Sequence, residues 1–535
     1  MAHVVNLPVE VILLICADLS NANIKSFRLT CTRISRIAQL RLTRVFLSAD
    51  PTNIRVFRAI ADHEKYREQI TEIIYDDARL THSRLSSSTG FGKPEWDKAV
   101  TMSTEGCPEW FAKVCHQNIA HLAIHKGQDV DLPHHIARAN QVNAQLPLGI
   151  CWQYYKNLIQ QQHEVLISKQ HEEAFLYGLT RFPSLTQVTI TPATHGLVFA
   201  PLYETPMIRA FPYGFNYPIP HGWPVEGIGS SLWEDDEERY KDRWHGFRMV
   251  TRVLAQEASH RVTELLIDVN GLPTGLNSSI FYTPRSEEYK NLVTILSKPG
   301  FRRLDLALSV GDQEHPNYDW IAFRTRYLSD MLSEAEELEH INLFTTLGMD
   351  SDHSLGSEVP GGGGSMAHFI PLQKVFPVSD WNKLRHFQLS RFMVTQSDLM
   401  GLLINISATI QTVSLNFLTF LDNGGDYHSL LNEIRDTLKW HEREPAFRPN
   451  LIIRVDVDPP YIGKEIWVEK QIHEFLYEGG RNPFLADCPN RIKAGMGMQR
   501  VTFEVVHERP YRRSALLSRP SIHVPPKICT CFIKC

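Results

Sequence analysis

The sequence predicts an α/β (α+β) protein in which a short N-terminal three-helix module precedes a long, irregular succession of strands and helices. Three observations predict this class. Apolar residues follow a helical period near the N-terminus, a short strand-like apolar pattern recurs along the rest of the chain, and amphipathic helical stretches separate its occurrences. The chain has 535 residues, of which 43% are hydrophobic and 21% charged, an ordinary balance for a folded protein.

The N-terminal module is predicted over residues 4–48, with its helices between residues 7 and 38. Pro8 suits the first position of a helix, where its missing N–H is no loss. Apolar residues at helical spacing are Val11, Ile12, Ile15 and Leu19 in the first helix, Ile24 and Phe27 in the second, and Cys31, Ile34, Ile37 and Ala38 in the third. So short a unit buries little apolar surface, so we expect another part of the chain or a second protein to cover the remainder.

The same residues resemble an F-box. The family pattern opens with Leu-Pro-x-Glu-Leu, and the chain has Leu7-Pro8-Val9-Glu10-Val11, then Leu19, then Arg28-Leu29-Thr30-Cys31. Thr30 stands where the family has Val, and Ile34 where it has Trp. The resemblance implies docking onto the Skp-type adaptor, and through it the cullin, of an SCF ubiquitin ligase. The implied adaptor-binding residues are Leu7, Pro8, Ile12, Ile15, Leu19, Ile24, Phe27, Leu29, Cys31 and Ile34. The alternative is a helical cap that packs on the rest of the chain.

The body, residues 60–510, repeats an apolar-x-x-apolar-x-apolar pattern typical of the strand in a leucine-rich repeat. The matches begin at Ile70, Ile119, Leu185, Val262, Phe301, Leu338, Leu384 and Ile410. Amphipathic helical stretches are predicted over residues 154–179, 244–258, 320–332, 396–406 and 427–440. The matches are spaced more widely than in regular repeats, so the prediction is an irregular, leucine-rich-repeat-like arc, with a generic α/β domain as the alternative.

Two segments of the body are similar to stretches of filamentous-fungal F-box proteins. They run from Glu72 to Leu80 and from Ile472 to Phe484. The resemblance implies a subunit that recognises a protein substrate, whose identity the sequence does not reveal.

Flexible insertions are predicted near residues 83–94, 191–240 and 350–368, and a disordered basic and Cys-bearing tail over residues 511–535. The second insertion is rich in Pro, Gly and aromatic residues, including Trp223 and Trp233. It is either a loop packed on the body or a flap that faces a target.

Motifs for catalysis are not found in the sequence. It contains no Gly-rich phosphate loop, nucleophile elbow or His-Glu-x-x-His motif, and its 24 histidines do not fall at metal-ligand spacing. We therefore expect no enzyme activity, no metal and no cofactor. A net charge of −5 argues against nucleic-acid binding, and no apolar stretch is long enough for a membrane span. Nine scattered cysteines and no secretory signal favour cytosol or nucleus.

Two functions follow from these expectations. The first is the substrate-recognition subunit of an SCF-type ubiquitin ligase, which binds the adaptor through the F-box and a protein target through the body. The alternative is a leucine-rich-repeat-like protein-binding scaffold with no role in ubiquitination.

Overall fold

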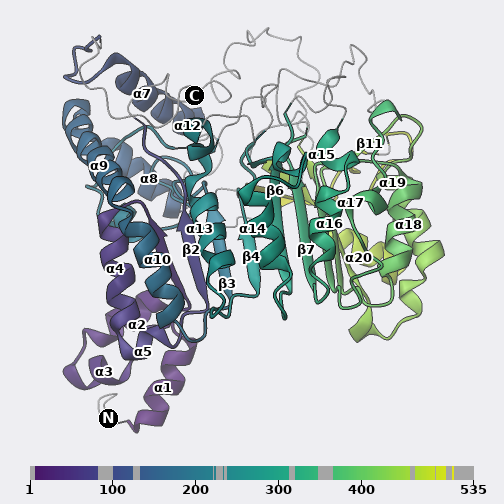
Figure 1. The fold of residues 1–535 in the computed structure, drawn as a ribbon, viewed down its shortest axis with the longest axis horizontal. Helices are drawn as coiled ribbons and strands as arrows, with labels where there is room; N and C mark the ends of the chain where they lie inside the picture. Colours follow the sequence, from purple (N-terminus) through teal and green to yellow (C-terminus); the bar gives the residue numbers. More distant parts are fainter. Residues whose placement is uncertain are drawn as a thin grey trace.

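In the computed structural model of the chain, one long sheet of thirteen strands runs through the described residues (Figure 1). The described residues are 7–81, 101–124, 133–220, 222–223, 233, 238–311, 320–347, 366–457, 464–488, 490–501 and 509–510. Insertion residues 83–94 and 350–365 and tail residues 511–535 lie outside them. The predicted α/β class is confirmed, since helices and a mostly parallel sheet make up the protein.

The sheet is built almost in chain order. Its order is β1-β2-β3-β4-β6-β7-β8-β10-β12-β13-β14-β15, with β5 beside β6, while β9 and β11 form a separate pair. The strands are β1 (Arg44–Ser48), β2 (Glu72–Asp76), β3 (Gln187–Thr191), β4 (Glu264–Ile267), β5 (Leu276–Asn277), β6 (Arg303–Ser309), β7 (His340–Thr345), β8 (His386–Ser390), β9 (Met393–Val394), β10 (Thr412–Asn416), β11 (Thr419–Phe420), β12 (Asn450–Asp456), β13 (Lys464–Trp467), β14 (Met498–Val501) and β15 (Arg509–Pro510). Pairing is parallel from β1 to β12 and antiparallel from β12 to β15.

The register keeps one row of apolar side chains across the parallel strands, because each strand starts level with its neighbour. The row consists of Val45, Ile73, Val188, Leu265, Leu304, Ile341, Phe387, Val413 and Leu451, all buried. Side chains alternate between the two faces along a strand. This row and the row two residues further along each strand therefore face the main core. The opposite face carries polar residues such as Thr189, Asp305 and Ser414.

Helices stand side by side over the apolar face of the sheet, and each contacts the next along the row (Figure 1). The helices of the body are α4 (Pro51–Asp62), α5 (Glu64–Arg67), α7 (Glu109–Ile124), α8 (Pro133–Asn143), α9 (Leu148–Ser168), α10 (Gln170–Arg181), α11 (Pro206–Arg209), α12 (Glu238–Lys241), η3 (Asp242–Trp244), α13 (His245–Gln256), η4 (Ser278–Phe281), α14 (Glu287–Leu296), α15 (Ile321–Arg324), α16 (Tyr327–Ser333), η5 (Met366–His368), α17 (Leu372–Val375), α18 (Gln396–Ile406), α19 (Tyr427–Glu433), η6 (Ile434–Leu438), η7 (Trp440–Glu442), η8 (Pro445–Phe447) and α20 (Glu469–Tyr477). The predicted stretch 154–179 is two helices, divided at Lys169, which has a left-handed φ of 55°.

Seven of the eight predicted strand patterns form strands, and one is wrong. The match that begins at Ile119 lies in α7, whose residues Phe111, Ala112 and Cys115 are buried at helical spacing. The helical pattern and the strand pattern both contain two apolar residues three positions apart. A match to the short pattern alone therefore does not distinguish a strand from a helix. The sheet also begins earlier than predicted, because Arg44–Ser48, at the end of the range assigned to the N-terminal module, form β1.

The described part of the insertion near 191–240 packs on the body and is not the flexible segment that was expected. Trp223 and Trp233 are each 1% exposed. The Trp223 indole donates to Asp77 Oδ2 at 2.8 Å, and the Trp233 indole donates to Glu288 Oε2 at 2.8 Å. Both aromatic side chains are therefore part of the core and do not face a target.

Candidate docking face on the N-terminal helices

Three short helices precede the sheet and lie at one end of it (Figure 1). They are α1 (Val9–Asp18), α2 (Asn21–Arg28) and α3 (Thr32–Ile37). Pro8 takes the position before α1, the Ser20 hydroxyl accepts from the Asn23 N–H at 3.2 Å, and the Cys31 sulfur accepts from the Ile34 N–H at 3.4 Å. Side-chain caps of this kind satisfy N–H groups that have no partner within the helix, so short polar residues set where α2 and α3 begin.

The three helices enclose a small core of their own. It consists of Ile12, Cys16, Ile24, Ile34 and Ala38, all at most 6% exposed. This cluster is separate from the main core of the sheet. The helical segment is therefore a distinct packing unit, which we call the N-terminal module (residues 7–37).

The outer surface of the module is apolar to an extent that a solvated helix does not require. Leu14 is 69% exposed and Leu29 is 88% exposed. The exposed large apolar residues of the module are Val9, Val11, Leu13, Leu14, Ile15 and Leu29, and we call them the docking face. Burying a side chain of this size contributes about 1.5–3 kcal/mol, so a partner that covers the docking face gains substantial free energy.

The ten predicted adaptor-binding residues divide into three groups. Ile12, Ile24 and Ile34 are enclosed in the core of the module, so their assignment as contact residues is corrected: they hold the helices together. Pro8, Ile15 and Leu29 are exposed. The four half-buried residues, which pack against the small core at its edge, are Leu7, Leu19, Phe27 and Cys31.

Sequence reasoning missed four residues of the docking face, Val9, Val11, Leu13 and Leu14. A signal was present, because α1 reads VEVILLICAD and is apolar on more sides than one core needs. A helix with apolar residues all round is covered on more than one side. The helical spacing identifies the side of α1 that the module itself covers, at Ile12 and Cys16, whereas the residues on its other sides are exposed.

The charge of the module differs from that of the whole chain. Residues 7–37 carry four basic side chains against two acidic ones, a net charge of +2 in a chain of −5. The basic residues are Lys25, Arg28, Arg33 and Arg36. A partner therefore meets an apolar α1 beside basic side chains on α2 and α3.

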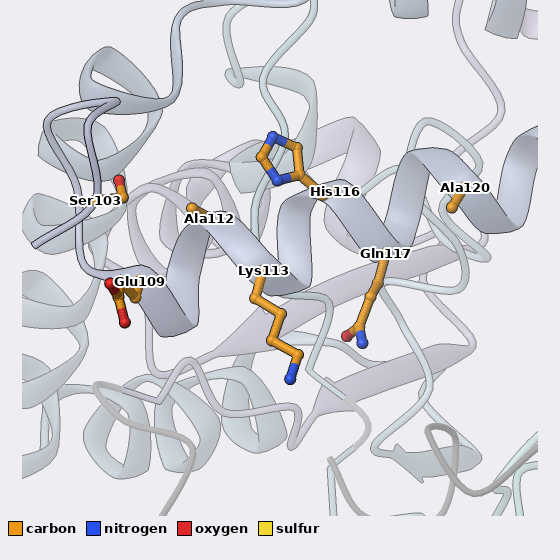
Figure 2. A pocket seen from close by; sticks show the side chains of 7 residues that line it. All are labelled: Ser103, Glu109, Ala112, Lys113, His116, Gln117 and Ala120. Atoms are coloured by element: carbon orange, nitrogen blue, oxygen red, sulfur yellow. The ribbon is translucent and has the colours of Figure 1, made fainter. Parts of the chain in front are cut away.

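A second surface feature is a hollow of about 500 Å³ along α7. Its lining residues are Ser103, Glu109, Ala112, Lys113, His116, Gln117 and Ala120. Figure 2 shows that His116 points away from Lys113 and Gln117, and His116 Nε2 lies 3.4 Å from Glu105 Oε1. Because these polar groups do not converge on one point, the hollow provides no site for acid–base chemistry.

A buried polar network lies where β2 ends. Asp77 Oδ2 accepts from the Trp223 indole, Asp77 Oδ1 accepts from the Gly246 N–H at 2.9 Å, and Arg79 lies 3.6 Å from the same oxygen. A side chain at position 246 would bring a Cβ to 2.6 Å from the Asp77 carboxyl, so glycine is required there. Burial raises the pKa of Asp77, and Arg79 opposes that rise. The network ties the insertion and α13 to the sheet.

Asp76, the neighbour of Asp77, takes part in a second contact. His195 Nε2 lies 4.0 Å from Asp76 Oδ2, and His195 Nδ1 lies 2.7 Å from the Tyr217 hydroxyl. Burial raises the pKa of Asp76 to about 7. An Asp, a His and a Tyr in series resemble a catalytic relay, but Asp76 is 2% exposed and His195 is 1% exposed. Because no substrate reaches them, this group connects the insertion to β2 and is not an active site.

Two histidines, one on α10 and one on α13, contact each other through their rings. His171 Nε2 and His245 Nε2 are 2.9 Å apart, and His171 Nδ1 lies 3.3 Å from the Val165 carbonyl. The carbonyl can only accept, so His171 carries its proton on Nδ1 and accepts at Nε2 from His245. Burial and the nearby Arg79 lower the pKa of His171 to about 4, and burial also lowers the pKa of His245.

The substitution His171→Gln is expected to cost less free energy of unfolding at pH 5.0 than at pH 7.5, by about 2 kcal/mol. The pKa of His171 in the folded protein, about 4, lies below its ordinary value of 6.5. The unfolded state therefore binds the proton first, and the stability that wild type has above pH 6.5 is lost as pH falls towards 4. The raised pKa of Asp76 makes stability depend on pH in the opposite direction, but it does so equally in wild type and in His171→Gln. Its contribution therefore cancels when the unfolding free energies of the two proteins are subtracted. Urea unfolding of both proteins at the two pH values measures the cost of the substitution at each pH. An equal cost at pH 5.0 and pH 7.5 would contradict the prediction.

Within the described ranges, no group of three or more His, Cys, Asp or Glu residues is placed to hold a metal ion. In that part of the chain, no helix combines the length and apolar character needed to cross a membrane. No protein-family model and no curated protein matches the chain. The candidate site is therefore identified from the features of this chain alone, and the docking face is the strongest of these features.

Proposed function

We propose that this protein is the substrate-recognition subunit of an SCF-type cullin–RING ubiquitin ligase. The N-terminal module acts as an F-box that binds the Skp-type adaptor, and the body, as a leucine-rich-repeat-like arc, holds a protein target. The ligase function is positional. Holding a target lysine beside ubiquitin's thioester raises its effective concentration without any catalytic residue from this chain.

The observation that carries this proposal is the concentration of exposed apolar residues on the module. Of the fifteen large hydrophobic residues that are exposed in the described part of the chain, six lie between Val9 and Leu29. Five of the six lie on α1, and exposed apolar residues concentrated on one element mark an interaction site, whereas single ones do not. The six belong to the segment whose sequence resembles an F-box, so the adaptor is the partner that we propose.

The arrangement of the body is compatible with the second half of the proposal. Its parallel strands follow one another in chain order with level registers, and polar residues line the face opposite the helices. The side chains Asn342, Gln388 and Ser414 lie level on three neighbouring strands of that face. Asn342 and Gln388 are partly exposed, so they offer hydrogen-bonding groups to a protein target.

Co-expression of the chain with a Skp-type adaptor and a cullin tests the proposal. We expect the three proteins to elute together in size-exclusion chromatography. A variant in which Leu13, Leu14 and Leu29 are all replaced by serine should elute alone, because it lacks the three most exposed residues of the docking face. Failure of wild type to retain the adaptor would contradict the ligase function and leave the protein-binding scaffold as the alternative.

A further inference from the structure

The connection between the module and the sheet is short, and its apolar residues pack against the core of the module at one end and against the main core at the other. Ala38 is buried in the core of the module and Leu40 packs against it, whereas Leu42 packs against the main core. The Leu42 N–H donates to Gln69 Oε1 at 3.3 Å, and the carbonyl of Thr43 accepts from two N–H groups at the start of β2. The chain then enters β1 at Arg44, so residues 38–43 do not form a loose linker.

Arg41 lies in the middle of this connection and binds back to the module. Its guanidinium donates to the carbonyls of Ala17 and Leu19, at the C-terminal end of α1. Carbonyls at that end have no helical partner and favour a cation. The main chain of Arg41 pairs with the Asn21 side chain in both directions, N–H to Oδ1 at 2.9 Å and Nδ2 to carbonyl at 2.7 Å. One residue thus ties the end of α1 and the start of α2 to the strand that begins the sheet.

One further contact joins the module to the body at a distance from Arg41. Arg28 Nη1 of α2 donates to the hydroxyl of Tyr66 of α5 at 3.5 Å. Because this bond is long, it contributes less than the two carbonyl bonds and the two main-chain bonds of Arg41.

We infer that Arg41 is a positioning residue that fixes the orientation of the N-terminal module relative to the sheet. The inference rests on the proposed function, in which the module is held by the adaptor and the sheet holds the target. A fixed orientation confines the target to a small volume near the ubiquitin thioester, whereas a loose connection spreads it over a larger one and lowers its effective concentration. Arg41 makes no part of the docking face, so its role is separable from adaptor binding.

The test compares Arg41→Ala with Arg36→Ala. Arg36 is an exposed arginine of α3, and the described residues include no side-chain partner for it. Distances are measured by electron spin resonance on the free chain, with spin labels on unnatural residues at Lys25 of α2 and Lys290 of α14, both exposed. We expect one narrow distance distribution for wild type and Arg36→Ala, and a distribution at least about twofold wider for Arg41→Ala. An equally narrow distribution in Arg41→Ala would overturn the inference.

A reconstituted ligase supplies the second measurement. Arg41→Ala should bind the adaptor as wild type does but transfer ubiquitin to the chain's own body lysines at least about threefold more slowly. If Arg41→Ala melts at a lower temperature, Asn21→Ala removes only the two main-chain bonds and should show the same effects to a smaller extent. Unchanged distances and transfer rates in both variants would overturn the inference. Because the distance measurement needs no adaptor, it gives its answer even if the ligase function fails.

Discussion

Replacing Leu14 by glutamate is expected to weaken binding of the Skp-type adaptor about 100-fold, or about 2.7 kcal/mol, without changing the unfolding temperature of the chain. Leu14 is 69% exposed, so the folded chain loses no packing when it is replaced. Burial of the leucine against the adaptor would contribute about 2 kcal/mol to the binding free energy. A glutamate at the same position would instead have to bury a carboxylate, which costs free energy. Titration calorimetry with purified adaptor measures the affinity, and scanning calorimetry measures the unfolding temperature.

Ile167→Glu provides the matched control for this substitution. Ile167 lies on α9 and is also 69% exposed, so the substitution places the same charge at the same exposure outside the module. We expect Ile167→Glu to bind the adaptor as wild type does. An equal affinity for both variants would show that the docking face is not the adaptor site. Ile12 is less suitable for such a test, because it is fully buried and its truncation would disrupt the module itself.

The substitution Asp77→Ala is expected to lower the free energy of unfolding by about 3–5 kcal/mol at pH 7.5. It leaves two donors without their acceptor, the indole of Trp223 and the N–H of Gly246, and it removes the carboxylate that forms an ion pair with Arg79. Each is buried, and an unpaired buried polar group costs about 1–3 kcal/mol. The loss is larger than that of a surface ion pair because Asp77 is 1% exposed and water does not replace it.

Urea unfolding followed by tryptophan fluorescence measures this loss. The control is Asp422→Ala, since Asp422 is exposed and its carboxylate has no contact in the described part of the chain, and we expect a change within about 0.5 kcal/mol. Asp77→Asn keeps an oxygen acceptor and should lie between the two. A cost for Asp77→Ala no larger than that for Asp422→Ala would contradict the role assigned to the network.

Local patterns predict most of the sheet because burial on one face imposes them. Leu304, Ile341 and Phe387 lie level on neighbouring strands, and each belongs to the apolar-x-x-apolar-x-apolar pattern that identified its strand. The pattern fails at Ile119, where helix and strand share the same short spacing. Leu42, Val45 and Leu47 at β1 match the same pattern, but they fall within the range 4–48 that is predicted to belong to the helical module.

The sequence identified the segment that carries the docking face but not all of the residues in it. The apolar spacing of α1 identifies Ile12, which the structure buries, whereas Leu13 and Leu14 remain exposed. Spacing along one helix gives the relative directions of its side chains. It does not say which direction faces a neighbouring helix, because that depends on how α2 and α3 pack.

By itself, the sequence determined the α/β class, three helices near the N-terminus and seven strands of the sheet, because these follow from periodicity within a few residues. Only the tertiary structure decided that the strands lie in chain order, that Trp223 closes over Asp77, and that Arg41 joins the module to the sheet. Trp223 and Asp77 are 146 residues apart in the chain. Contacts of that range arise from the packing of many elements at once, and no local pattern records them.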